Sequence, residues 1–335
     1  MNVNKNINIL PLNIWLISMF ILVTFIVIVG GLTRLTESGL SITVWEVFKG
    51  VLPPLNLQEW NYYFNEYKKI PEYKLLNSEM SLHEFKVIFY WEYSHRLLAR
   101  FIGLISIVPL IYFSIKYEEF LKNYKKYFIL FILIIFQGFV GWYMVKSGLD
   151  KNLDVDHYRL AIHFTIALII LSLSLWFFFD LNNIKKFNIK LPFKLTFIVL
   201  ILVILQIIFG SLLAGLNGGL IYNTWPDMNG FFSPNDTNLN DYFSLSVLNN
   251  PSIIQFLHRI TAYFLLILIV LLNIFYFKLN LDFKSILFFD LAIAIQIFLG
   301  IVTLLTGVEI KYASLHQIGS IIVLCSYLYI YYKNT

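Results

Sequence analysis

The segment VGGLTRLTESGLSITVWEVFKG, residues 29–50, has a second copy 180 residues further along the chain: FGSLLAGLNGGLIYNTWPDMNG, residues 209–230. The two segments align without a gap and share a glycine or tryptophan at four positions: Gly30 with Gly210, Gly39 with Gly219, Trp45 with Trp225 and Gly50 with Gly230. Unequal loops shorten the offset further on, where three more pairs align: His95 with His258, Arg96 with Arg259, and His163 with His316. The repeat predicts two structurally related halves.

Long apolar runs surround both copies and predict helices that cross a membrane. The chain has 335 residues, of which 59% are hydrophobic and only 13% are charged, a composition that excludes a soluble domain. Crossing the hydrocarbon layer takes about 20 residues as a helix. Eight runs fit that length: 14–32, 95–115, 127–145, 159–179, 195–215, 252–277, 285–306 and 313–332. Because these runs lack the alternation of barrel strands, we predict an all-α polytopic membrane protein with eight transmembrane helices.

The repeat groups the predicted spans into two pseudo-symmetric four-helix bundles, residues 1–180 and residues 181–335. Four spans separate the copies, so both halves should point the same way across the membrane, about a pseudo-two-fold axis along its normal. The first half contains a large outer loop, residues 33–94. Within this loop LQEWNYYFNEYKK, residues 57–69, predicts a short amphipathic helix, and SLHE, residues 81–84, fits a capping box that opens a helix leading into the second span.

Charge distribution predicts the orientation and the surroundings of the chain. Lysines and arginines are concentrated in the short connections that lie inside if the N-terminus is inside, so both termini should be cytoplasmic. The formal net charge of +5 can suggest nucleic acid, but these residues lie where a cytoplasmic leaflet would attract them. We therefore expect membrane lipid as a partner and no nucleic acid. The single cysteine, Cys325, excludes an intramolecular disulfide.

Four of the six histidines obey the repeat: His95, His163, His258 and His316. Each is predicted just inside the outer end of an even-numbered span, so all four share one depth, and ionisable residues inside a bilayer usually have a function. Two imidazoles on different helices of a bundle can form the axial pair of a six-coordinate haem. Zinc or copper would need further ligands, which one cysteine does not supply. The pattern favours one bis-histidine haem site in each half.

Other functions are compatible with intramembrane histidines. A proton relay usually includes carboxylates within the spans, and Asp290, near the inner end of the seventh span, is the only clear candidate. A transporter with parallel repeats could line its path with histidines. A diheme b-type electron-transfer cytochrome would also use two histidine pairs, although such proteins usually place their haems towards opposite membrane faces.

Polar residues beside the histidines differ between the two halves. Arg96 and Arg259 each follow a histidine, and with Arg100 they are candidates either to reach lipid head groups or to bind haem propionates. Only the first half has a carboxylate one turn before its histidine, because Glu92 aligns with Gln255. Beside a haem, Glu92 could accept protons or stabilise positive charge on an oxidised carbon; otherwise it is a surface residue at a helix entrance. This asymmetry predicts a reacting haem in the first half and an electron-handling haem in the second.

Glycines also follow the repeat. Gly30 aligns with Gly210, and Gly141 aligns with Gly300 one turn after the aligned Gln137 and Gln296. We interpret these glycines as positions that permit close contact between helices.

Four longer motifs resemble the haem A synthase family, in the branch shared by proteobacteria and mitochondria. They are GGLTRLTESGLSITVWEVFKGVLPPL (30–55), EWNYYFNEYKKIPEYKLLN (59–77), EFKVIFYWEYSHRLLARFIG (84–103) and NTWPDMNG (223–230). The resemblance runs from the first predicted span to the last. One branch of the family carries a cysteine pair in the first outer loop, which this chain lacks.

The resemblance implies a haem-dependent membrane oxidoreductase that oxidises the C8 methyl group of haem O to the formyl group of haem A, for terminal oxidase assembly. Carried over, His95 and His163 would flank the substrate or product haem. His258 and His316 would ligate a haem b cofactor, and Glu92 would be the catalytic carboxylate. We further expect a bacterial inner membrane location, haem O synthase and an electron donor or acceptor as partners, and a possible homo-oligomer.

Overall fold

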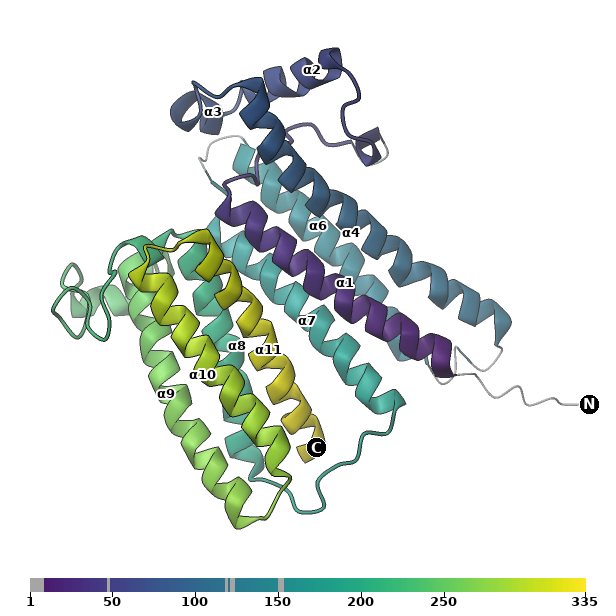
Figure 1. Cartoon of the computed structure of the whole chain (residues 1–335), viewed down its shortest axis with the longest axis vertical. Helices are drawn as coiled ribbons and strands as arrows, with labels where there is room; N and C mark the ends of the chain where they lie inside the picture. The colour runs from purple at the N-terminus through teal and green to yellow at the C-terminus, as the bar shows by residue number, and fades with distance from the viewer. Residues whose placement is uncertain (1–8, 47–48, 118–119, 121–123, 150–153) are drawn as a thin grey trace, which may run out of the picture. The chain divides into compact units, whose positions relative to one another are not determined.

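The computed structural model is helical throughout its regular secondary structure (Figure 1). It describes residues 9–46, 49–117, 120, 124–149 and 154–335. Within these residues eight helices are long and apolar enough to cross a membrane. They are α1 (Ile9–Leu35), α4 (Leu82–Lys116), α6 (Phe128–Leu149), α7 (His157–Leu181), α8 (Phe193–Gly215), α9 (Pro251–Lys278), α10 (Phe283–Leu305) and α11 (Ile310–Asn334). The predicted all-α membrane class is confirmed.

The chain divides into two compact units, Met1–Leu181 and Asn182–Thr335. In the first unit α1 and α6 each pack against both α4 and α7. In the second unit α8 and α10 each pack against both α9 and α11. Each unit is therefore a closed ring of four helices, and helices that align in the repeat have equivalent neighbours. The pseudo-symmetric arrangement of one bundle about the other stays a prediction.

Helix α4 begins at Leu82, where the sequence predicts the start of a helix that leads into the second span. The helix starts at Leu82 because the Ser81 side chain accepts a hydrogen bond from the Glu84 backbone, while the Glu84 side chain accepts one from the Ser81 backbone. This reciprocal pair confirms the predicted capping box and satisfies two backbone donors that a helix start leaves open. The apolar run that begins at residue 95 predicts where the chain enters lipid, and the helix starts 13 residues before that point.

A small cap at the start of α4 consists of α2 (Leu57–Tyr67) and α3 (Pro71–Leu76) (Figure 1). The Asn56 side chain accepts from the Glu59 backbone and starts α2, which confirms the predicted amphipathic helix. Its buried residues lie against α4: Trp60 packs against Phe89, and Phe64 packs against Phe85, both with ring centres 5.0 Å apart. Burial of these rings stabilises the cap on α4 by the hydrophobic effect.

A buried carboxyl group lies inside this cap. Glu72 is only 5% exposed, and its Oε1 accepts a hydrogen bond of 2.9 Å from the Tyr67 hydroxyl, which in turn accepts from the Asn77 amide at 2.8 Å. Burial raises the pKa of Glu72 from 4.5 to about 7, because desolvation of the charged form outweighs the Tyr67 hydrogen bond. Glu72 therefore titrates near neutral pH in the folded cap.

We expect the stability of the cap to fall as the pH rises. The folded cap holds the Glu72 proton more tightly than the unfolded chain, so this contribution is fully present below pH 4.5 and is lost as the pH rises through about 7. A shift of this size corresponds to about 3 kcal/mol. Hydrogen exchange of α2 and α3, corrected for intrinsic rates, should lose protection over this range. Glu72→Gln should remove the loss, and Glu79→Gln, an exposed control, should leave it unchanged; equal pH dependence in all three proteins would contradict this assignment.

Candidate functional site

The first histidine pair lies across the core of the first bundle. His95 comes from α4 and His163 from α7, the two helices that share α1 and α6 as neighbours. Their ring centres are 6.5 Å apart. Each ring lies against a glycine: a Cβ atom added at Gly30 of α1 would be 3.1 Å from His95 Nε2, and one added at Gly141 of α6 would be 2.8 Å from His163 Cε1. The helices that flank the pair thus leave room for both imidazoles.

The second pair repeats this arrangement within the second bundle. His258 of α9 and His316 of α11 also have ring centres 6.5 Å apart. A Cβ atom added at Gly210 of α8 would be 3.2 Å from His258 Cε1, and one added at Gly300 of α10 would be 2.8 Å from His316 Cε1. The predicted role of these glycines in helix contact is therefore incomplete, because each one makes space for a histidine ring. The sequence signal for this role is that the glycines are paired in the repeat, as the histidines are.

The separation of the ring centres in both pairs matches that of two imidazoles with a metal between them. Metal–imidazole bonds of about 2 Å on each side, and about 1 Å from each nitrogen to its ring centre, separate the ring centres by about 6 Å. Among the described residues no group of three or more histidine, cysteine or acidic side chains could hold an ion by itself. Two protein ligands without a third suit a haem, whose ring supplies the remaining nitrogen ligands.

Backbone contacts orient the imidazole of His316. Its Nδ1 lies 3.1 Å from the Gln296 carbonyl oxygen, and donating a proton there leaves Nε2 with the lone pair that a metal needs. The Gln296 side chain also donates to the His316 carbonyl at 3.0 Å, and the aligned Gln137 donates to the His163 carbonyl at 2.9 Å. The two glutamines that align in the repeat thus bind the backbones of α7 and α11 at equivalent positions.

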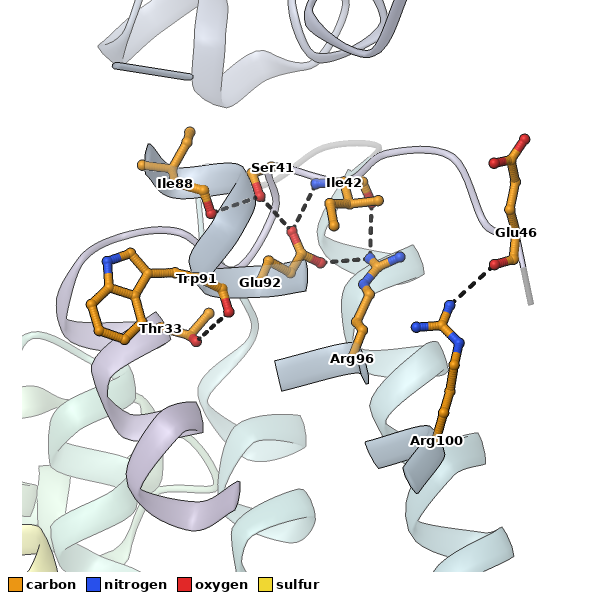
Figure 2. A network of polar contacts seen from close by, with 9 residues as sticks. All are labelled: Thr33, Ser41, Ile42, Glu46, Ile88, Trp91, Glu92, Arg96 and Arg100. Carbon is orange, nitrogen blue, oxygen red and sulfur yellow. Dashed lines mark hydrogen bonds and ion pairs between the residues drawn. The ribbon is translucent and has the colours of Figure 1, made fainter. Parts of the chain in front are cut away.

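Glu92 is a buried member of a polar network rather than a surface residue at a helix entrance (Figure 2). It is 3% exposed and lies one helical turn before His95 on α4. Its Oε2 accepts from the Ser41 hydroxyl at 2.8 Å and from the Ile42 backbone N–H at 2.7 Å. Its Oε1 accepts from Arg96, with which it forms an ion pair. Three donors offset part of the desolvation of this carboxyl group.

The arginines beside the histidines bind loop backbone, an outcome that neither sequence interpretation included. Arg96 donates to the Ile42 carbonyl at 2.9 Å, and Arg100 donates to the Glu46 carbonyl at 3.1 Å (Figure 2). In the second unit Arg259 donates to three loop carbonyls: Tyr222 at 2.9 Å, Thr224 at 3.0 Å and Asp227 at 2.7 Å. A guanidinium has five N–H donors, so binding of a propionate by these residues stays a prediction.

Asp290 is a half-buried residue that joins two helices of the second bundle rather than a solvated end group. It accepts a hydrogen bond of 3.0 Å from the Asn273 amide, which links α10 to α9. Sequence analysis missed Ser41 and Ile42 as partners of Glu92, because both lie about 50 residues before it in an irregular segment. Only the fold brings that segment to α4.

Comparison with known proteins gives full-length matches. A family model described as "Cytochrome oxidase assembly protein", COX15-CtaA, matches residues 13–328. The chain is 59% identical over 335 residues to a protein of Pelagibacter ubique (strain HTCC1062) named "Heme A synthase", covering 100% of both chains. It is 41% identical over 323 residues to one of the same name from Wolbachia pipientis wMel, covering 95% of this chain and 91% of that one. For one of the same name from Bartonella henselae the identity is 39% over 324 residues, covering 94% and 89%.

Proposed function

Because the chain belongs to the COX15-CtaA family of cytochrome oxidase assembly proteins, we propose that it is a haem A synthase, a multi-pass membrane oxidoreductase that converts haem O to haem A. The observation that carries this proposal is the full-length similarity to proteins of that name, which extends over both histidine pairs. A diheme electron-transfer cytochrome is not favoured, since a plain carrier gives no reason for a carboxylate in only one of two equivalent bundles.

The two bundles have different roles in this proposal. His95 and His163 hold the substrate, haem O, whose C8 methyl group becomes the formyl group of haem A. His258 and His316 hold a haem b cofactor, which supplies electron transfer when bound. The paired rings at 6.5 Å and the glycine beside each ring support one haem in each bundle, and the carboxyl group beside the first pair alone supports placing the substrate there.

Glu92 is the carboxylate that assists the oxidation. Converting a methyl group into a formyl group adds an oxygen atom, passes electrons to an acceptor and releases protons, and positive charge develops on the carbon as it is oxidised. A carboxylate one helical turn from His95 can accept those protons or stabilise that charge. The position in α4 and the three donors around Glu92 hold it in one orientation.

The surroundings of the enzyme follow from its charge pattern and chemistry. We place it in a bacterial inner membrane with cytoplasmic termini and with the four histidines near the outer face, as the lysine and arginine distribution supports. Membrane lipid, haem O synthase and an electron donor or acceptor are its proposed partners, because the hydrophobic substrate and the redox step require a supply of each. A homo-oligomer is compatible with this arrangement.

The function is tested by expressing the chain beside haem O synthase in cells that lack haem A, then extracting the haems and identifying them by mass. We expect haem A only when both proteins are present. Membranes with haem O synthase alone, which should contain haem O, serve as the control. Purified protein that carries only haem b, with haem O unchanged in the membrane, would instead support the electron-transfer cytochrome.

A further inference from the structure

One polar contact is common to both bundles and therefore belongs to the fold. Arg96 donates to the Ile42 carbonyl, and Arg259 donates to the Tyr222 carbonyl. Ile42 and Tyr222 align in the repeat, as do the two arginines. In each unit this contact fixes the segment after the first bundle helix to the helix that carries the first histidine of the pair.

A second set of contacts exists in the first bundle alone. The Ser41 hydroxyl and the Ile42 N–H both donate to Glu92 Oε2. In the second bundle Gln255 occupies the position of Glu92 and donates its amide to the Tyr222 carbonyl at 3.0 Å, while Ile221 occupies the position of Ser41. The second bundle thus keeps the arginine contact but has neither the hydroxyl nor the carboxylate. Because the second segment is held against its helix without a serine, the fold does not require one.

We propose that Ser41 is a positioning residue for Glu92, an inference that rests on the proposed role of Glu92 in oxidation of the substrate. A carboxylate has about four acceptor positions. Ser41 and the Ile42 N–H use both positions of Oε2, and Arg96 uses one position of Oε1 (Figure 2). The remaining position lies on Oε1, so Ser41 determines which oxygen can meet the substrate and in which direction.

Burial makes this arrangement well defined. Ser41 is 1% exposed and Glu92 is 3% exposed, so water does not readily replace the hydroxyl if it is removed. The Ser41 oxygen also lies 3.3 Å from the Ile88 carbonyl on α4, which holds the hydroxyl beside the helix. Without the hydroxyl, Oε2 keeps only the Ile42 N–H, so a second acceptor position opens on that oxygen beside the open position on Oε1.

The test uses Ser41→Ala in the complete, haem-loaded protein. Loss of one hydrogen bond to a charged group should lower conversion of haem O by roughly tenfold to a hundredfold. Haem content should stay unchanged, and Ser41→Thr, which keeps the hydroxyl, should restore most of the conversion. Isotope-edited infrared spectra should show a shifted carboxylate stretch in Ser41→Ala, assigned to Glu92 by its disappearance in Glu92→Gln.

Ser38→Ala is the matched control. Ser38 lies in the same segment, is 0% exposed, and its hydroxyl donates to the Thr36 carbonyl rather than to Glu92. It should leave both the conversion and the Glu92 infrared band in place. Equal losses in the two alanine variants, or loss of haem in Ser41→Ala, would show that Ser41 merely supports the loop. Full conversion in Ser41→Ala beside inactive Glu92→Gln would overturn the inference on Ser41 alone, whereas full conversion in Glu92→Gln would overturn the proposed role on which it rests.

Discussion

Replacing Glu92 with glutamine should lower conversion of haem O to haem A by about a hundredfold to ten-thousandfold, the usual contribution of a positioned acid or base. The amide keeps the size of the side chain but cannot accept a proton or stabilise positive charge in the same way. Haem extraction from membranes that also contain haem O synthase measures the effect as the ratio of haem A to haem O. Both haem sites should stay occupied, because the histidines are unchanged.

The second bundle indicates that the Glu92→Gln protein will fold. Gln255 occupies the equivalent position, and its amide donates to the Tyr222 carbonyl, which also accepts from Arg259. The equivalent carbonyl in the first bundle is that of Ile42, to which Arg96 already donates. A glutamine at position 92, on the same helix face as Arg96, can reach it. The substitution therefore copies an arrangement that the molecule already contains, and lost conversion would report on chemistry rather than on folding.

A second isosteric substitution separates this effect from a general loss of charge. Glu46 lies in the same loop and accepts a hydrogen bond of 2.6 Å from the Tyr63 hydroxyl, outside the contacts of Glu92. Glu46→Gln should keep most of the conversion. If Glu92→Gln converted haem O as well as the unaltered protein does, the proposed role of the carboxylate would be wrong.

The repeat explains how much of this site could be predicted. Apolar runs and aligned histidines are properties of the sequence itself, and they determine the eight helices and the pairing of His95 with His163 and of His258 with His316. The asymmetry between Glu92 and Gln255 is likewise visible in the aligned letters. These features follow from local composition and from the comparison of the two copies. Neither depends on the path of a loop.

The remaining features depend on how irregular segments pack. The segment at Ser41 has no periodicity, so its contact with Glu92 follows only from the path of the loop over α4. The arginines illustrate the same limit: the sequence suggests lipid head groups and propionates as their partners, but it does not show the backbone carbonyls of a folded loop to which they also donate. The burial of Glu72 depends on the docking of α2 and α3, which residue type alone predicts as exposed.

Replacing one histidine of each pair should remove a different haem. Changes beside a metal ligand already lower metal affinity about 10- to 100-fold, so loss of the ligand itself should lower haem affinity further. His163→Ala should abolish haem A formation and leave the haem b absorbance of the second bundle. His316→Ala should remove that absorbance, and conversion should stop because the haem b that carries electrons for the oxidation is lost. Absorbance spectra and the mass of the extracted haems distinguish the two outcomes.

His83→Ala provides the matched histidine control, because His83 is exposed in the first turn of α4 and lies outside both pairs. It should leave both haems and the conversion unchanged. Loss of the same haem from His163→Ala and His316→Ala would contradict the assignment of one haem to each bundle. Retention of both haems in both variants would contradict axial ligation by these residues.

The glycines test the same assignment without removing a ligand. An alanine at Gly141 would place its Cβ 2.8 Å from His163 Cε1, and an alanine at Gly300 would place its Cβ 2.8 Å from His316 Cε1. Both distances are shorter than real carbon contacts allow, so each ring has to shift within a closely packed bundle. Each alanine should therefore weaken the same haem as the histidine beside it, while Gly103→Ala, where nothing lies within 4 Å, should weaken neither. If the glycine and histidine variants lose the same haem, haem retention depends on the position of each ring as well as on its nitrogen. A bis-histidine site of fixed width requires this dependence.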